Sequence, residues 1–286
     1  MKSIITVITV ALILGLSDIL ISNIYLRNTS HQKVLAQNTV QMPSPTPSPE
    51  STPTPSPSPS PVYTGFCLNV PILLYHHIQP NEQAKQKGQT ALSVDSQIFD
   101  SQMSYLASSA YSTITVDQIA QALKNHQQLP PKSIIITMDD GYQDQFTYAF
   151  PIIQKYHLTV NLMIPTGLLN NPDYMSWDQL KQMSGSGLAH AYDHTYSHAN
   201  LGAVDAEKLK FEVMTGKKQL EEKLGKPINI FAYPYGSENN TVINFLTTNG
   251  FIAALSTIPG QIQCDSFIMS LHRTRIGNSS IRAYGL

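Results

Sequence analysis

Beyond residue 62, apolar runs of strand length alternate with segments in which apolar residues recur at helical spacing. The strand-like runs are residues 70–75, 133–138, 158–164, 188–192, 228–233 and 251–256. The helical patterns are residues 96–107, with Phe99, Met103 and Leu106 on one face, and residues 178–183 and 205–224. Repeated βα alternation predicts a mainly parallel sheet with helices outside it, either open or closed into a barrel.

The N-terminus has a different pattern. Residues 4–26 are largely apolar, with an interruption at Ser17 and Asp18, so we expect residues 1–30 to be an export signal or a membrane anchor. Gly15 and Ser17 offer small residues for cleavage, whereas the whole stretch is long enough to span a bilayer. An ionised Asp18 at the centre of such a helix would cost about 2.5 to 3.5 kcal/mol. We favour the uncleaved anchor, and cleavage is the alternative.

Residues 43–61 are almost entirely Pro, Ser and Thr, a composition that offers no apolar side chains to bury. We therefore interpret residues 31–61 as a linker that does not fold. At about 3.1 Å per residue, an extended Pro-rich segment of this length reaches roughly 60 Å. The alternative is a ligand for a proline-recognition domain, although the basic flanks typical of such ligands are missing. Residues 62–286, about 225 residues, suffice for one α/β domain.

Charge and cysteine content narrow the function. Only 13% of the residues are charged and the net charge is -1, so the sequence has no nucleic-acid-binding footprint. The two cysteines, Cys67 and Cys264, show no CxxC spacing, which argues against a thiolate metal site. In an oxidising compartment they could form a disulfide, provided that the first and last strands are neighbours. Two unrelated buried thiols are the alternative.

Two acidic residues follow the most apolar strand. Asp139 and Asp140 come directly after residues 133–138 and precede Gly141. In parallel βα folds ligands bind at the carboxyl ends of strands, and two adjacent carboxylates there repel each other unless a cation or a proton serves one of them. The alternative is an ordinary Asp-Gly turn.

A pair of histidines follows a later strand. His194 and His198 are four residues apart, a spacing at which two imidazoles can bind one cation. Together with a carboxylate from another strand end they would form a set of two His and one Asp with coordination positions left open, which is typical of catalytic sites. Taken alone, such a pair is more often surface or core histidine.

A third segment ends another strand in a Pro-aromatic-Gly turn. Residues 231–236 include Tyr233, Pro234 and Tyr235, and such a turn exposes backbone N–H groups that can stabilise an oxyanion. The alternative is a rigid loop whose tyrosines only pack.

In this order the three segments resemble the polysaccharide deacetylases, the NodB-homology group of metal-dependent carbohydrate esterases. The resemblance covers residues 68–278 and takes in PILLYHHI at 71–78, Trp177 in MSWDQL, and LHRTRI at 271–276. The sequence is most similar to the branch that deacetylates poly-N-acetylglucosamine-type surface polymers, whose members open with a PxLxYH strand.

The resemblance implies a fold and a set of roles. The fold would be α/β, a distorted, incomplete (β/α) barrel forming a single catalytic domain over residues 62–286. Asp139 would be the general base, Asp140, His194 and His198 the ligands of one divalent cation, and the backbone N–H of Tyr235 an oxyanion donor. Zinc is the expected ion, with cobalt, nickel and iron as alternatives. Such an ion polarises the acetyl carbonyl and activates water, whose proton the base removes.

Three positions depart from the family pattern. Ala232 stands where many members carry an arginine that orients the base, and Arg273 or Arg275 is our candidate replacement. Leu271, His272 and Arg273 stand where a Leu-x-His often supplies the general acid, so the proton donor is unassigned. The segment at 190–193 also differs from the common pattern, which leaves the partners of His194 open.

Other residues are candidate substrate contacts. His76 follows the strand at 70–75 and is expected either to line the pocket, as a contact or an acid, or to be a structural histidine. Trp177 is expected to pack rather than to stack on a sugar. The full set of candidate contacts is His76, Tyr233, Pro234, Arg273, Arg275 and His272.

The sequence therefore predicts a metal-dependent hydrolase that removes N-acetyl groups from an extracellular or cell-wall amino-sugar polymer, such as poly-N-acetylglucosamine, a chitin-like glycan or peptidoglycan. The partners expected are this polysaccharide and the membrane, through the anchor, with a monomeric catalytic domain and no nucleic acid. The protein would be exported, either anchored and facing outward or the periplasm, or secreted if cleaved. The alternatives are a carbohydrate-binding relic without activity and a relative acting on small cyclic amides.

Overall fold

The computed structural model describes residues 63–286. The predicted signal or anchor at residues 1–30 and the predicted linker at residues 31–61 lie outside this part of the chain. Within the described residues, no helix combines the length and the apolar character needed to span a membrane.

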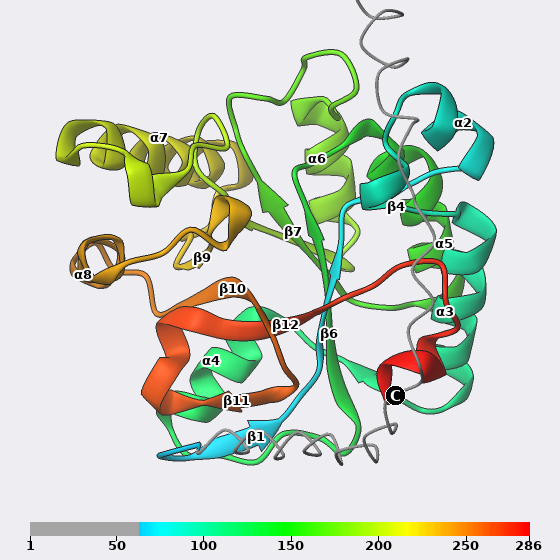
Figure 1. The fold of residues 1–286 in the computed structure, drawn as a ribbon, viewed down its shortest axis with the longest axis horizontal. Coiled ribbons are helices and arrows are strands. Elements are labelled where there is room, and N and C mark those ends of the chain that lie inside the picture. The colour runs from blue at the N-terminus through cyan, green and yellow to red at the C-terminus, as the bar shows by residue number, and fades with distance from the viewer. Residues whose placement is uncertain (1–62) are drawn as a thin grey trace, which may run out of the picture. The chain divides into compact units, whose positions relative to one another are not determined.

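Seven parallel strands form a closed ring, and most of them are labelled in Figure 1. Strand β2 pairs with β6 as well as with β12, and this second pairing closes the sheet. The ring runs in the order β2 (Ile72–Tyr75), β12 (Leu271–Arg275), β10 (Ala253–Pro259), β9 (Ile230–Ala232), β8 (Ala189–Asp193), β7 (Val160–Ile164) and β6 (Ser133–Asp139). The predicted barrel fold is confirmed, with seven strands in the ring.

The barrel is distorted at two joints. Strands β8 and β9 share one paired position, Asp193 with Phe231, and the register between β10 and β12 shifts along their length. The short β5 (Ser112–Thr113) lies outside the ring and pairs with β6 alone. The sequence pattern identified every strand of the ring except β12, because Leu271–Arg275 carries three basic side chains in place of an apolar run.

Helices surround the ring, and their first residues follow local capping rules. Thr115 and Ser176 form capping boxes, and Asp95, Asp205 and Asn239 accept from backbone N–H groups at the starts of their helices. The helices are α2 (Asn81–Gln86), α3 (Ser96–Ser108), α4 (Val116–Lys124), α5 (Phe150–Tyr156), α6 (Trp177–Gly185), α7 (Ala206–Leu224) and α8 (Asn240–Thr248). Trp177 packs against the hydrophobic core, as expected from the sequence.

A small antiparallel pair lies beside the barrel. Strand β1 (Cys67–Asn69) pairs with β11 (Ile262–Cys264), with Cys67 opposite Cys264, and a disulfide joins the two residues. The strands that follow them along the chain, β2 and β12, are neighbours in the ring. The sequence analysis made a disulfide conditional on the first and last strands being neighbours, and the structure meets this condition. The remaining short pair is β3 (His77–Ile78) with β4 (Ser93–Val94).

Candidate active site

Asp140, His194 and His198 come together although they belong to two different strand ends. Asp140 follows β6, and the two histidines follow β8. Asp140 Oδ1 lies 3.1 Å from His198 Nε2 and 3.4 Å from His194 Nε2. The three potential ligand atoms lie within 4.8 Å of one another. The arrangement is open on one side, since His198 is partly exposed while Asp140 and His194 are buried.

Hydrogen bonding shows which way the His194 ring is protonated. Its Nδ1 lies 2.7 Å from the Ala232 carbonyl oxygen, which can only accept, so Nδ1 carries the hydrogen. In the neutral ring, Nε2 then directs a lone pair at Asp140 Oδ1, a buried oxygen without a hydrogen-bond donor among the described residues. A lone pair and a carboxylate oxygen facing each other call for a cation between them. The donor set therefore fits a divalent metal ion.

Asp140 and His198, together with Thr195 from the same loop as the histidines, have left-handed backbone conformations. The φ angles are 75° at Asp140, 71° at Thr195 and 60° at His198. Such conformations are costly for residues other than glycine and tend to be kept at functional sites.

Asp139 is paired with an arginine that lies 134 residues further along the chain. Arg273 on β12 donates from Nη1 to Oδ1 and from Nη2 to Oδ2, both at 2.8 Å. The same side chain donates from Nε to the Ser256 carbonyl at 2.7 Å, and it is 1% exposed. Burial raises the pKa of Asp139, but the guanidinium prevails and lowers that pKa, so the carboxylate is ionised at neutral pH.

Of the two arginines predicted from sequence, only Arg273 contacts the acid. Arg275 donates to the Ala91 carbonyl at 2.8 Å and lines the cavity described below. Ala232, where many family members carry the arginine, accepts a hydrogen bond from His194 through its carbonyl. The guanidinium that contacts Asp139 comes instead from Arg273 on β12.

A cavity of about 660 Å³ opens over these groups. His76 lines it, and burial lowers the pKa of this imidazole, although Asp139 and Asp140 oppose the effect. Tyr235 has φ of 60° and is 68% exposed as a residue, and its ring centroid lies 4.6 Å from that of His198. The lining comprises Leu74, His76, Leu92, Asp139, Asp140, Tyr142, Tyr174, His194, His198, Tyr233, Tyr235, Thr257 and Arg275.

Some predicted contacts lie elsewhere. His272 does not line the cavity, because it alternates with Arg273 along β12, and its ring stacks on Phe267 at a centroid distance of 4.5 Å. Pro234 is buried in the turn and is also absent from the lining. Tyr233 reaches the cavity, but its hydroxyl donates to the Met269 carbonyl at 2.8 Å.

Two tyrosines at the site were missed. Tyr142 and Tyr174 line the cavity with ring centroids 5.3 Å apart, and Tyr142 also stacks on His77 at 3.6 Å. His77 itself is a structural residue, since its Nδ1 lies 2.6 Å from Asp144 Oδ2. Tyr142 follows the Asp-Asp-Gly sequence directly and could have been found from that position, whereas Tyr174 lies in a loop without any sequence signal.

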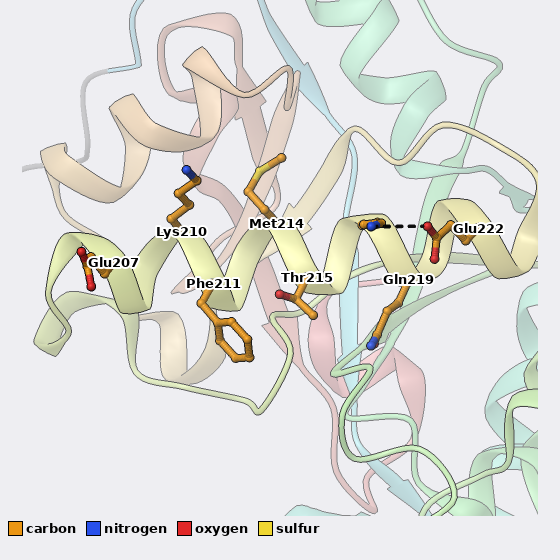
Figure 2. A pocket seen from close by; sticks show the side chains of 8 residues that line it. Glu207, Lys210, Phe211, Met214, Thr215, Gln219 and Glu222 are labelled. Atoms are coloured by element: carbon orange, nitrogen blue, oxygen red, sulfur yellow. Dashed lines mark ion pairs between the residues drawn. The ribbon is translucent and has the colours of Figure 1, made fainter.

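A second hollow, of about 690 Å³, lies along the outer face of α7 and shares no lining residue with this cavity. Figure 2 shows Glu207, Phe211 and Glu222 projecting from this side of the helix. An ion pair joins Lys218 to Glu222 at 3.7 Å. The mixed charges on one exposed helix face resemble an ordinary solvated surface, and none of the predicted site residues lies there.

Comparison with known proteins gives consistent matches. The family model described as polysaccharide deacetylase matches residues 126–254. A protein of Bacillus subtilis (strain 168), provisionally named polysaccharide deacetylase YxkH, is 25% identical over 207 residues, which cover 72% of this chain and 71% of the relative. The poly-beta-1,6-N-acetyl-D-glucosamine N-deacetylase of Escherichia coli (strain K12) is 22% identical over 248 residues. That match covers 72% of this chain but 36% of the relative.

Among solved structures, the Streptococcus pyogenes deacetylase PplD in complex with acetate is similar, with a TM-score of 0.67 and 27% identity. The similarity covers 73% of this chain and 92% of that one. The residues matched by the family model include the acid pair, the two histidines and the Tyr235 turn, whereas His76 and Arg273 lie outside them. The resemblance predicted from the sequence motifs is therefore confirmed.

Proposed function

This chain belongs to the polysaccharide deacetylase family, and we propose that it removes N-acetyl groups from an amino-sugar polymer outside the cytoplasmic membrane. The observation that carries this proposal is the position of Asp139. It is a buried carboxylate, kept ionised by Arg273, in the same cavity as the unpaired Asp140 oxygen and the two imidazoles.

Asp140, His194 and His198 would hold the cation, and we propose zinc because two imidazoles and a carboxylate suit it. Cobalt, nickel and iron are the alternatives. A divalent ion at this position supplies Lewis-acid polarisation of the acetyl carbonyl and makes water more acidic. Asp139 accepts the proton of the attacking water, and Arg273 holds the carboxylate in the orientation and the charge state that this step requires.

His76 is our candidate for the proton donor to the leaving amine. It lines the cavity with Asp139 and Asp140, and no other imidazole in the lining is free of the proposed metal set. In the free protein its lowered pKa keeps it neutral at neutral pH, so it has to gain the proton during the reaction. The backbone N–H of Tyr235 is the proposed oxyanion donor, beside His198 in the same lining.

The surroundings of the cavity favour a polymer over a small substrate. A hollow of about 310 Å³ adjoins it, sharing Leu92, Tyr142 and Tyr174. A second, of about 380 Å³, shares His76, Leu92 and Arg275. Neighbouring sugars of one chain could occupy these hollows, with the aromatic rings offering apolar faces for stacking. A poly-N-acetylglucosamine-like glycan is the proposed substrate, following the E. coli relative.

The apolar N-terminus and the Pro-rich segment support an exported protein held at a membrane. Deacetylation there would turn a neutral polymer into a cationic one, since the freed amines bind protons, and would increase its adhesion to anionic surfaces such as those in biofilms.

The test is acetate release from N-acetylglucosamine oligomers of two to six units, using the purified chain with and without chelator. We expect release that stops with chelator, returns on addition of zinc, and becomes faster with oligomer length. A carbohydrate-binding relic would bind the oligomers and release no acetate with any of the four metals. The intact Asp139–Arg273 pair favours the enzyme.

A further inference from the structure

The loop that carries both histidines, residues 194–198, rests against helix α7. Ser197 contributes two donors to one carboxylate on that helix. Its N–H donates to Glu212 Oε2 at 2.7 Å, and its hydroxyl donates to Glu212 Oε1 at 2.6 Å. The N–H of Tyr196 donates to the main-chain carbonyl of Glu212 at 2.9 Å. Three hydrogen bonds thus connect this loop to a single helical residue.

The burial of Glu212 is unusual for an acidic residue on a helix. Its side chain is 0% exposed, and its one ion-pair partner within residues 63–286 is Lys208, at 2.7 Å, which is itself 46% exposed. Burying a carboxylate is costly unless its oxygens are satisfied by donors, and here both oxygens are occupied by Ser197 and Lys208. The other acidic residues of α7 that project outward, Glu207 and Glu222, are exposed and lie on the face seen in Figure 2.

A second contact lies one turn further along the same face of α7. A Cβ atom on Gly216 would come within 2.4 Å of Asp193 Oδ1 and 3.1 Å of the Thr195 main chain. The helix therefore approaches the beginning of the loop as closely as glycine permits, while Glu212 holds its end. Thr195 and His198 lie on either side of the hydrogen-bonded residues Tyr196 and Ser197, and both have left-handed φ angles, which are costly for residues other than glycine.

We propose that Glu212 is a positioning residue for the metal site. Through Ser197 it fixes the loop so that the Nε2 atoms of His194 and His198 already converge on Asp140 before the cation arrives. Glu212 contacts neither the cation nor the substrate. This inference rests on the proposed function for the presence of the ion, and it adds a residue from outside the three motifs to the metal site.

The experiment measures cation affinity in the full chain after chelator treatment, by competitive titration with zinc. Glu212→Gln keeps the volume and one carbonyl acceptor but cannot accept from both donors of Ser197. Ser197→Ala removes only the hydroxyl. Glu207→Gln is the matched control, with the same charge change on the exposed face of the same helix. Partners of metal ligands typically change metal affinity by roughly 10-fold to 100-fold, and we expect a loss in this range for Glu212→Gln.

We expect a smaller loss for Ser197→Ala, no further loss in the double variant, and no change for Glu207→Gln. The visible absorption of the cobalt-loaded protein should differ between Glu212→Gln and the wild type, because displaced ligands change the coordination geometry. General destabilisation of the fold would not alter that spectrum. If Glu212→Gln fails to fold, Ser197→Ala supplies the same comparison.

The outcomes separate the two proposals. A wild-type chain that binds no divalent cation overturns the proposed function. A wild-type chain that binds zinc, with a folded Glu212→Gln that has the same affinity and the same cobalt spectrum, overturns this inference alone. In the same way, an unchanged affinity in Ser197→Ala contradicts it where Glu212→Gln cannot be purified.

Discussion

The two ends of the barrel strands differ in what they bury. At the carboxyl ends lie ionised and polar groups that are almost completely buried, including Asp139, Asp140, Arg273 and His194. The opposite end holds the β1–β11 pair, the disulfide, and an apolar cluster that joins Leu68 and Ile72 to the residues of α4. In Figure 1, β1, β11 and α4 lie together at this end.

The comparison teaches that one barrel separates reactivity from stability. The buried charged groups at the carboxyl ends of the strands are kept in place by specific partners. Those partners also set the protonation states of the charged groups, as Arg273 does for Asp139. The opposite end, at the amino ends of the strands, is held by burial of apolar surface and by one disulfide. Changes at the carboxyl ends of the strands should therefore alter catalysis, and changes at the amino ends should alter stability.

The largest effect is expected for His198→Ala. Loss of one of the three proposed cation ligands should lower kcat/KM by at least about 1,000-fold, since such an ion would contribute several kcal/mol to the transition state. The unfolding midpoint of the metal-free protein should change little, because His198 is partly exposed. Acetate release and bound-metal content measure the first effect, and calorimetry the second. Retained activity with bound zinc would contradict the assignment of this ligand.

Removing the disulfide should have the opposite result. Cys67→Ser combined with Cys264→Ser opens a link between residues 197 positions apart, and it should cost about 2 to 5 kcal/mol in the free energy of unfolding. Activity of the folded variant on oligomers should stay near that of the wild type. Urea denaturation with parallel assays measures both quantities. A large loss of activity at full stability would show that the two ends are not separate.

Arg273→Gln tests whether partners at the carboxyl ends of the strands set the protonation state of Asp139. Burial raises the pKa of Asp139 and Arg273 lowers it, so without the guanidinium that pKa rises. Because Asp139, as the proposed base, has to be ionised, the acidic limb of kcat/KM should move to higher pH. Arg275→Gln, which does not contact Asp139, should leave the limb in place. If the acidic limb lies at the same pH in the wild type, Arg273→Gln and Arg275→Gln, Asp139 is not the titrating base.

The smallest change is expected for Tyr235→Gly. Glycine adopts φ of 60° without strain, so the backbone N–H should keep its position while the exposed ring is lost. If the N–H is the oxyanion donor, kcat/KM should fall by less than about 10-fold, whereas loss of a donor costs about 100-fold to 1,000-fold. Steady-state kinetics on the same oligomers distinguish the two. A fall in the larger range would give the ring a role of its own.

Much of the fold was predictable from the sequence because its signals are local. The run at 133–138 is apolar enough to be a buried strand in any context, and the acid pair necessarily follows it. The spacing of His194 and His198 is equally local. In parallel βα folds the ends of successive strands meet at one face, so these motifs could be expected to share a site.

The sequence alone determined the α/β class, the three motifs and the family that they resemble, since each is written in a few adjacent residues. Only the tertiary structure decided between Arg273 and Arg275, removed His272 from the site, brought Tyr174 to it, and placed Glu212 against the 194–198 loop. Those outcomes depend on how β12 alternates and on which helix packs against the 194–198 loop. Contacts between residues far apart in the chain are fixed by closure of the barrel, and no local pattern encodes them.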